Sequence, residues 1–328
     1  MAAFRYFAIC TAFVIFAAVW SLPVLAAGDR QDFGAWLEEL RQEARQKGIS
    51  ERILREALHD GIRPLPRVLE LDRRQPEGTL SFEQYKNNML GVRRVQTGRL
   101  MMRRHEEALQ EAGRQYGVPP AVIAALWGME TNYGGYTGGF NVIEALATLA
   151  YDGRRGPFFR GELLAALQIL EEGHIKPSEM KGSWAGAMGQ SQFMPTSFLN
   201  YAVDADGDGR RDIWGTHRDV FASAANYLAQ HGWRSGERWG RRVQLPQNFP
   251  ETLTGLDTEK TLAEWQALGV RREDGANLPQ VEGMTGSVIK FTDNEAYLVY
   301  NNFRVIMRWN RSTYFATAVG LLSDQLSY

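Results

Sequence analysis

Cysteine is almost absent from this chain. The 328 residues contain a single one, Cys10, which lies inside an apolar run near the N-terminus. A chain cleaved after that run would contain none, so disulfides, thiolate nucleophiles and cysteine-ligated metals are excluded from the mature protein. Cys10 also comes too early, and without the preceding small residues, for a lipid-attachment site. No lipid anchor is therefore expected.

An excess of charge of either sign is missing as well. The chain has 37 lysines and arginines against 38 aspartates and glutamates, a formal net charge of -1. This balance provides no bulk electrostatic attraction for nucleic acid, which is not expected as a partner. Internal repeats and low-complexity segments are also absent. The 44% of hydrophobic residues is enough for one large domain or two to three smaller ones, and excludes a fibre or a disordered tail.

The N-terminus has the layout of an export signal. Arg5 precedes an apolar run from Tyr6 to Leu25, which ends in small residues before the polar Gly28-Asp29-Arg30. This pattern predicts a secretory signal peptide over residues 1–27 and a periplasmic protein. A membrane anchor is the alternative, because the run is nearly long enough to span a bilayer. The small-residue end and the polar chain after it favour cleavage.

Residues 28–117 are expected to form a helical N-terminal domain. Apolar residues recur at helical spacing from Phe33 to Leu40, and Ser50 stands at the start of a further helix. Residues 100–116 have the pattern of one charged amphipathic helix. A stretch with several prolines, 63–76, separates these helical segments.

Residues 234–299 are expected to form a small β-containing or linker domain. Three segments rich in β-branched and aromatic residues predict short antiparallel strands: 287–291, 296–299 and 303–309. Residues 312–326 predict a helix with Ser312 or Thr313 as its N-cap. Residues 300–328 would then contribute a strand and a helix that complete the core of residues 118–233.

A helix is predicted from the proline pair at 119–120 to Glu130, ended by Tyr133-Gly134-Gly135. Ile123, Trp127 and Glu130 are spaced i, i+4 and i+7, so the carboxylate shares a face with two large apolar side chains. An apolar surrounding favours the protonated carboxyl group, as a general acid requires. The alternative is a glutamate at a helix end that reaches solvent.

Residues 118–233, the expected central domain, also contain a glycine-rich block over 182–195. Its glycines and alanines let the backbone pass close to another surface. Ser183, Gln190 and Gln192 add neutral hydrogen-bonding groups that suit sugar hydroxyls and amides. A tight packing loop would explain the glycines but not this density of polar groups.

Residues 204–219 resemble a calcium-binding loop. The oxygen ligands at positions one, three and five are Asp204, Asp206 and Asp208. Arg210 would offer its backbone carbonyl, but Gly215 occupies the twelfth position, where a bidentate glutamate is expected. Asp212 or Asp219 would have to complete the shell. The pattern favours a structural Ca²⁺ over the alternative, a hydrogen-bonded Asx turn.

These motifs together resemble the membrane-bound lytic murein transglycosylase B family, one of the lysozyme-like groups. The resemblance rests on 127–134, on 182–195 with its Gln-Phe-Met-Pro sequence, and on the calcium-type loop followed by Ala225-Asn226-Tyr227. It extends to 68–76 and 301–318, and so covers nearly all of the mature chain. The order and spacing of the blocks carry more weight than any single block.

The resemblance implies a mainly α (α+β) fold, in which a helical domain and a small β-containing domain flank a lysozyme-like helical catalytic core. It implies that Glu130 protonates the glycosidic oxygen between N-acetylmuramic acid and N-acetylglucosamine. Glu130 would then act as base on the C6 hydroxyl of the same muramic residue, closing a 1,6-anhydro ring without water. Ordinary glycosidases use two carboxylates. Asp152 and Glu144 are the nearest second groups in sequence, and both are interpreted as structural.

The resemblance implies substrate-binding roles for Ser183, Gln192, Arg154, Arg155, Tyr227, Asn310, Trp309 and Phe315. Ser183 and Gln192 would lie beside Glu130, and the two arginines near the charged or peptide portion of the substrate. The remaining residues would line the glycan groove. Some relatives carry tyrosines at the last two positions, so stacking on sugars is carried over but hydroxyl contacts are not. Core packing is the alternative for both aromatic residues.

The expected partner is the peptidoglycan glycan strand, with other cell-wall enzymes as further candidates. No cofactor is expected for the chemistry itself. Two alternative functions remain at this stage. One is a hydrolytic muramidase of the same fold, which would produce reducing ends. The other is a peptidoglycan-binding protein without catalytic activity.

Overall fold

The computed structural model describes residues 32–74 and 80–327, so the predicted signal peptide lies outside the described residues. Tertiary contacts group the chain into two units, each made of two separate stretches. Unit 1 combines residues 1–79 with 130–223, and unit 2 combines residues 80–129 with 224–328. The linear domain boundaries inferred from the sequence remain a prediction.

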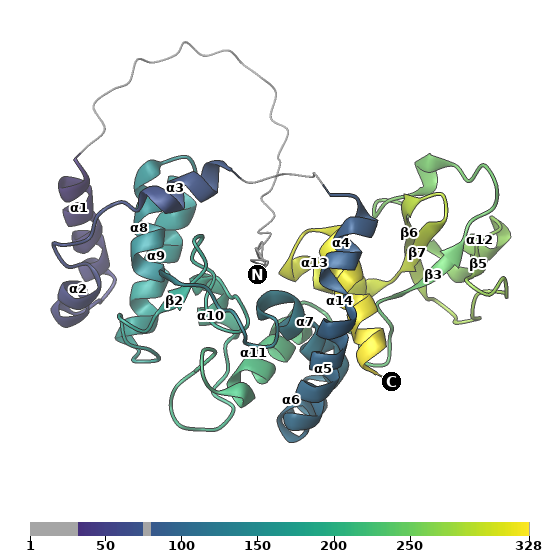
Figure 1. Cartoon of the computed structure of the whole chain (residues 1–328), viewed down its shortest axis with the longest axis horizontal. Helices are drawn as coiled ribbons and strands as arrows, with labels where there is room; N and C mark the ends of the chain where they lie inside the picture. Colours follow the sequence, from purple (N-terminus) through teal and green to yellow (C-terminus); the bar gives the residue numbers. More distant parts are fainter. Residues whose placement is uncertain (1–31, 75–79, 328) are drawn as a thin grey trace, which may run out of the picture. The chain divides into compact units, whose positions relative to one another are not determined.

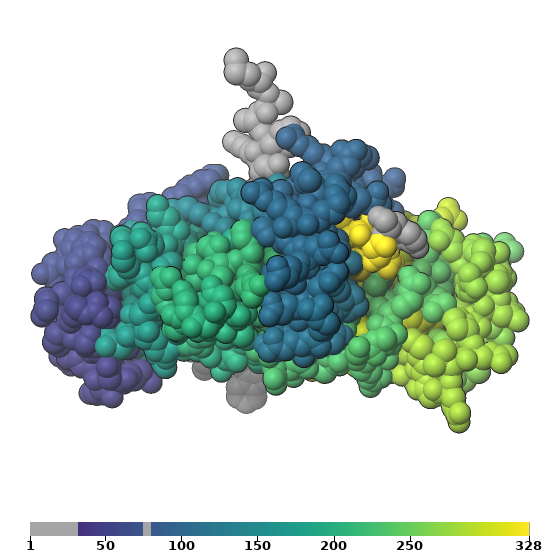
Figure 2. Space-filling view, turned by 90° about the horizontal axis from the view of Figure 1, so that it is seen from below, coloured from purple at the N-terminus to yellow at the C-terminus, as the bar shows by residue number. Residues whose placement is uncertain are grey.

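Unit 1 is built mainly from helices (Figure 1). Its elements are α1 (Phe33–Gln46), α2 (Glu51–Ala57), α3 (Pro66–Arg73), β1 (Phe140–Asn141), α8 (Val142–Asp152), α9 (Gly156–Glu171), β2 (Lys181–Gly182) and α10 (Pro195–Tyr201). Helices α8 and α9 pack side by side, with α2 against α9 and α3 against α8. Figure 2 shows the purple atoms of the first helices against the teal atoms of this unit.

Two of the predicted helices of unit 1 begin where the sequence indicates. Asp32 caps α1 by accepting a hydrogen bond from the Gly34 N–H, and the Ser50 side chain accepts from the Ile53 N–H at the start of α2. The proline-containing stretch 63–76, however, contains the additional helix α3. Pro66 stands in the first turn of α3, where its missing N–H costs no hydrogen bond.

Unit 2 combines helices with a five-stranded sheet. Its elements are α4 (Phe82–Met89), α5 (Val92–Arg104), α6 (Glu106–Tyr116), β3 (Gly240–Gln244), η1 (Glu251–Leu253), β4 (Lys260–Thr261), α12 (Leu262–Ala267), β5 (Arg271–Arg272), β6 (Thr285–Thr292), β7 (Glu295–Val299), α13 (Asn301–Trp309) and α14 (Thr313–Leu326). The limits of the two units fall within α7 (Pro120–Thr131) and α11 (His217–Gln230).

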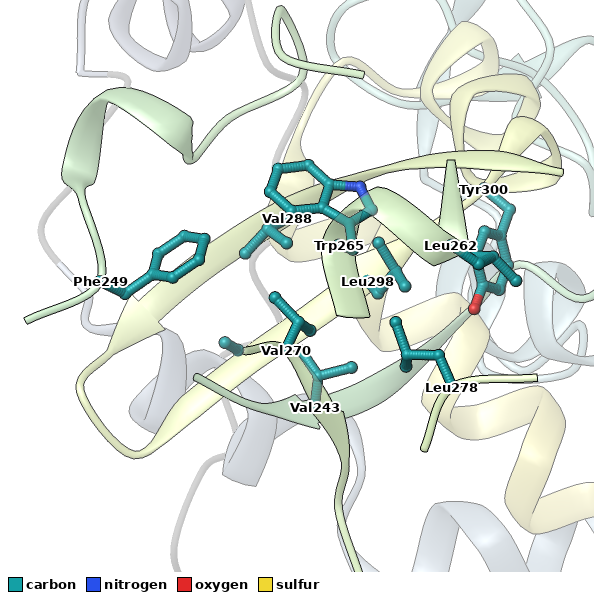
Figure 3. Close-up of a cluster of buried hydrophobic side chains, with 10 residues drawn as sticks. Val243, Phe249, Leu262, Trp265, Val270, Leu278, Val288, Leu298 and Tyr300 are labelled. Carbon is teal, nitrogen blue, oxygen red and sulfur yellow. The ribbon is translucent and has the colours of Figure 1, made fainter. Parts of the chain in front are cut away.

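The sheet is antiparallel, in the order β4-β6-β7-β3-β5. Strands β6 and β7, both predicted from the sequence, pair with Ile289 opposite Tyr297. The core under the sheet is formed around Trp265 of α12, which is fully buried and donates its indole N–H to the Gly286 carbonyl over 2.8 Å. Figure 3 shows Val288 and Leu298 of these strands beside Trp265.

The prediction of a strand over 303–309 is wrong, because these residues belong to helix α13. Its buried residues include Phe303 and Ile306, three positions apart, as one face of a helix requires. Asn302 ties the start of α13 to another segment. Its side chain accepts from the Arg234 N–H over 2.8 Å and donates to the Glu237 carbonyl over 2.7 Å. Short apolar runs do not distinguish helix from strand by periodicity alone.

The prediction of one continuous helix over 100–116 is also wrong. Helix α5 ends and α6 begins at His105, whose backbone leaves the helical conformation with φ -115° and ψ 26°. The His105 ring packs edge-on against Trp127, with 5.6 Å between the ring centroids. The predicted C-terminal helix is confirmed as α14, with Ser312 as its N-cap.

Candidate active site

Glu130 lies one residue before the end of α7. Every residue from Ala121 to Met129 is buried, including Ile123 and Trp127, whereas Glu130 is half-buried. The helix is apolar on all its faces, as expected of a helix inside a core. Glu130 is therefore the ionisable residue at the edge of an apolar environment, and it retains access to solvent.

A tight left-handed turn follows Glu130. Asn132, Tyr133 and Gly134 have positive φ values of 51°, 60° and 77°, and the first two are conformations that residues other than glycine seldom adopt. The buried Thr131 hydroxyl stabilises the turn. It accepts from the Gly134 N–H and donates to the Gln190 carbonyl, each over 3.1 Å. This bond joins the end of α7 to the glycine-rich block.

The glycine-rich block, residues 182–195, folds back on itself. Met188 and Phe193 exchange backbone hydrogen bonds of 2.8 and 3.1 Å, and Gly182 pairs with Phe140 of β1. Its glycines are required by packing. A Cβ atom on Gly182 would lie 2.2 Å from the Ala187 carbonyl oxygen, far inside van der Waals contact. The prediction that these glycines allow close backbone approach is confirmed.

Backbone groups already occupy part of the hydrogen-bonding capacity of the polar side chains in the block. The Ser183 hydroxyl accepts from the Ala185 and Ala187 N–H groups over 3.3 and 3.0 Å, so its own hydrogen remains to be donated. The Gln192 amide donates to the Thr137 and Gly189 carbonyls over 3.1 and 2.8 Å. Its side-chain oxygen is therefore the atom with which it would accept a hydrogen bond from a substrate.

Arg154 and Arg155 lie in the turn between α8 and α9, and both contact Asp72 of α3. The Asp72 carboxylate is buried, with one oxygen 2.6 Å from the Arg154 guanidinium and 3.2 Å from that of Arg155. Arg155 also lies over the Phe159 ring, 4.7 Å from its centroid. Nearby, Asp152 pairs with Arg73 over 3.2 Å.

In the calcium-type loop, Asp204, Asp206 and Asp219 each offer a carboxylate oxygen within 4.8 Å of the others. Asp208 is engaged elsewhere, since its carboxylate binds the Arg210 guanidinium over 2.9 Å and the Arg210 N–H over 2.8 Å. Three carboxylate oxygens form a hard donor set, which suits Ca²⁺.

Asp219, on α11, is better placed than Asp212 to complete this set. It lies within the group of carboxylates that includes Asp204 and Asp206, and Asp212 does not. Both side chains also accept backbone N–H groups: Asp219 from Ala205 and Asp212 over 2.8 and 2.7 Å, and Asp212 from Trp214 and Gly215, each over 2.9 Å. Asp219 is fully buried, and burial raises the pKa of its carboxyl group to about 6. A bound cation would compensate a buried carboxylate.

The remaining predicted site residues belong to unit 2. Tyr227 donates its hydroxyl to the Arg308 carbonyl over 2.7 Å, and its ring meets Trp309 edge-on at 4.9 Å between centroids. Trp309 is half-buried, and the half-buried Asn310 accepts from the Ser312 N–H over 3.2 Å. Phe315 is only 6% exposed, which agrees with core packing.

Comparison with known proteins identifies the family of this chain. The family model described as Transglycosylase SLT domain matches residues 32–324. The chain belongs to this family. The resemblance inferred from the sequence motifs is thereby confirmed.

Individual relatives of this SLT-domain protein agree with the family match. Membrane-bound lytic murein transglycosylase B of Escherichia coli is 33% identical over 247 residues, 74% of this chain and 66% of that protein, slightly under two thirds of its length. SltB3 from Pseudomonas aeruginosa, in complexes with NAG-anhNAM-pentapeptide and with NAG-NAM-pentapeptide, superposes with a TM-score of 0.88 at 45% identity, covering 90% of this chain and 80% of SltB3. The E. coli Slt35 complex with calcium gives a TM-score of 0.77 at 31% identity, covering 90% and 93%.

The structural relatives also confirm the predicted fold class of the SLT-domain chain, mainly α with a lysozyme-like helical core. Among residues 32–74 and 80–327, no helix is both long and apolar enough to cross a bilayer.

Three further residues bond to the predicted site segments of this SLT-domain chain, and the sequence assigns none of them a role. They are Thr131, Asp72 and the buried Glu162, which accepts from the Thr196 N–H and hydroxyl over 2.9 and 2.7 Å directly after the glycine-rich block. Their partners lie 59, 83 and 34 positions away, so no local pattern identifies them.

Proposed function

We propose that this chain cleaves the β-1,4 bond between N-acetylmuramic acid and N-acetylglucosamine in peptidoglycan and leaves a 1,6-anhydro end. The hydrogen bond between the Thr131 hydroxyl and the Gln190 carbonyl carries this proposal, because it joins the segment of Glu130 to the block that holds Ser183 and Gln192. Membership of the SLT-domain family supports it, as does the complex of the relative SltB3 with an anhydro-muramic ligand.

In the proposed reaction, Glu130 first donates its proton to the glycosidic oxygen. The bond from C1 of the muramic residue to that oxygen breaks, and positive charge develops on the muramic ring. The C6 hydroxyl of the same residue then attacks C1, while the Glu130 carboxylate removes the hydroxyl proton. Water is not consumed and Glu130 ends protonated, so one carboxyl group is enough.

Ser183 and Gln192 are proposed to orient the sugar beside Glu130. Ser183 retains a hydrogen to donate, and Gln192 presents an oxygen acceptor, so together they suit a ligand with both hydroxyl and N-acetyl groups. We assign Tyr227, Trp309 and Asn310 to the glycan groove as the resemblance implies, and Phe315 to the core packing that was its alternative, because it is buried. Trp309 has the greater exposure of the two aromatic residues for stacking on a sugar face.

We also propose that Asp204, Asp206 and Asp219 bind a structural Ca²⁺, with the Arg210 carbonyl as an additional ligand. Asp208, the other ligand expected from the sequence, would have to release the Arg210 guanidinium to join them. The calcium complex of the relative Slt35 supports this assignment. The ion would cross-link the loop and the start of α11, and it has no step in the chemistry.

The proposed location is the periplasm, with residues 1–27 removed during export. N-terminal sequencing of the protein from a periplasmic fraction tests it. Recovery of the protein only in a salt-resistant membrane pellet would contradict this location.

Mass spectrometry of the fragments released from purified sacculi tests the proposed reaction. The mature protein should release fragments one water lighter than hydrolysed muropeptides. Glu130→Gln should lower the rate by at least about 100-fold, because an amide cannot supply the proton. Glu144→Gln is the matched control and should retain activity, since Glu144 is interpreted as structural.

Two results would replace the proposal with its alternatives. Fragments with reducing ends would make the protein a hydrolytic muramidase. Binding to sacculi without release of any fragment would make it a peptidoglycan-binding protein.

A further inference from the structure

The proposed chemistry does not use Asp72, although its environment is unusual for an aspartate. Asp72 lies in α3 and is 3% exposed. Carboxylates are rarely buried to this degree unless they are paired, because removing a charge from water is costly. The partners of Asp72 are the two arginines that the family resemblance associates with substrate.

The contact is bridging, with one carboxylate oxygen serving both guanidinium groups. Arg154 lies 2.6 Å from this oxygen and also donates to the Asp72 backbone carbonyl over 3.1 Å, while Arg155 lies 3.2 Å from the same oxygen. A guanidinium held at two points loses much of its rotamer freedom before a ligand arrives. Asp72 thus orders the Arg154 and Arg155 side chains before the substrate binds.

The pairing leaves surplus positive charge at this corner of unit 1. One carboxylate serves two cations, and the neighbouring Arg73 is already paired with Asp152. The Arg154 side chain is still 54% exposed and that of Arg155 34%. Exposed guanidinium groups recognise carboxylates by paired hydrogen bonds.

We infer that Asp72 is a positioning residue that holds Arg154 and Arg155 to receive a carboxylate of the stem peptide. Asp72 then determines how strongly the enzyme prefers glycan strands that carry peptides over strands without them. The inference rests on the proposed function and adds a source of substrate preference that lies outside the glycan. Asp72 acts only through the arginines and does not touch the substrate.

Kinetics on two substrates test the inference: glycan strands with their stem peptides, and the same strands stripped of peptide by an amidase. The measured quantity is the ratio of kcat/KM on peptide-bearing strands to kcat/KM on stripped strands. Asp72→Asn should lower this ratio about 5-fold, mainly through KM on the peptide-bearing strands, because a neutral amide holds the guanidinium groups less firmly. Asp152→Asn removes a carboxylate from the same corner without touching Arg154 or Arg155, and should leave the ratio unchanged.

Arg154→Lys gives a second measurement, which does not depend on the folding of an altered buried position. Lysine keeps the charge at an exposed site but lacks the planar fork of donors that pairs with a carboxylate, so the ratio should again fall. In an Arg154→Ala/Arg155→Ala background, the addition of Asp72→Asn should not lower the ratio further, because Asp72 would then have nothing to position.

An unchanged ratio in Asp72→Asn and Arg154→Lys would overturn the inference. An equal loss on both substrates with a lower Tm would also overturn it, by making Asp72 purely structural. If the unaltered enzyme cleaves both substrates equally well, the inference fails while the proposed function stands. If it cleaves neither, the proposed function itself fails.

Discussion

The glycine-rich block 182–195 and the calcium-type loop 204–219 both belong to unit 1 and both contain left-handed glycines, but different forces set their conformations. A Cβ atom on Gly186 would lie 2.4 Å from the Leu146 side chain, and one on Gly189 would lie 2.7 Å from the Ile213 carbonyl oxygen. Gly207 and Gly209 have no atom within 4 Å of such a Cβ. Packing against neighbouring elements therefore determines the block, whereas the loop depends on backbone conformation and charge.

The two segments of unit 1 also differ in burial. Most of the block is buried, whereas residues 206–210 are exposed. Gln190 connects the two, since its N–H donates to the Ile213 carbonyl over 2.8 Å and its side chain to the Trp214 carbonyl over 2.9 Å. Because close packing already holds the block, calcium should stabilise the loop and leave the geometry of the block unchanged despite this link.

A matched pair of glycine substitutions tests this comparison with the largest expected effect. Gly186 and Gly209 have nearly equal φ values, 89° and 88°, so alanine carries the same backbone cost of about 1 kcal/mol at both. Only Gly186→Ala also overpacks the core, which brings its loss of unfolding free energy to roughly 3 kcal/mol. Urea unfolding at a fixed calcium concentration measures both variants. Equal losses would show that packing does not distinguish the segments.

Calcium should increase the free energy of unfolding by nearly as much as the Gly186→Ala substitution lowers it. Calcium at 100 times its Kd should add about 2.7 kcal/mol to the free energy of unfolding, which would raise Tm by roughly 5 °C in a protein of this size. Differential scanning calorimetry with calcium and with chelator measures the shift. Asp219→Asn should abolish it, whereas Arg210→Ala should keep it, because Arg210 would contribute only its backbone carbonyl. An unchanged Tm in the unaltered protein would favour an Asx turn.

Thr131→Val breaks the polar connection between α7 and the block, with an intermediate effect. The buried Gln190 carbonyl and the Gly134 N–H would both lose their partner, at a cost of about 2 kcal/mol. Cleavage of sacculi should slow, because the segments of Glu130 and Gln192 are no longer tied. Thr131→Ser keeps the hydroxyl and should retain stability and rate. The calcium-induced rise in Tm should be the same in both variants, and its loss in Thr131→Val would show that the effect of the ion depends on the link between α7 and the block.

The smallest expected effect is a pH dependence of Tm that arises from Glu162, which bonds to Thr196 directly after the block. Burial raises the pKa of the Glu162 carboxyl group, so the folded protein favours its protonated form. The stability that this group contributes is full below its unfolded pKa, and is lost as the pH rises through its folded pKa. The Tm of the unaltered protein should therefore fall relative to that of Glu162→Gln as the pH rises above the unfolded pKa of a glutamate, about 4.3. Parallel Tm curves for the two proteins would show that Glu162 does not titrate differently on folding.

Much of the fold and of the site could be predicted from local sequence. Helix α7 and the segment of Glu130 follow from a proline pair and strong helix formers, and Ser50 and Ser312 cap their helices as their side chains allow. Strands β6 and β7 follow from their β-branched and aromatic residues. In these segments the signals lie within a few residues of one another.

The sequence by itself determined the family, the position of Glu130 and the composition of both glycine-containing segments, because each depends on neighbouring residues. Only the tertiary structure decided that 303–309 is helical and that Asp72 holds two arginines 82 and 83 positions away. It also decided that Thr131 joins α7 to the glycine-rich block. Each of these features depends on burial and on a hydrogen-bond partner from a distant segment, and both exist only after the chain has folded.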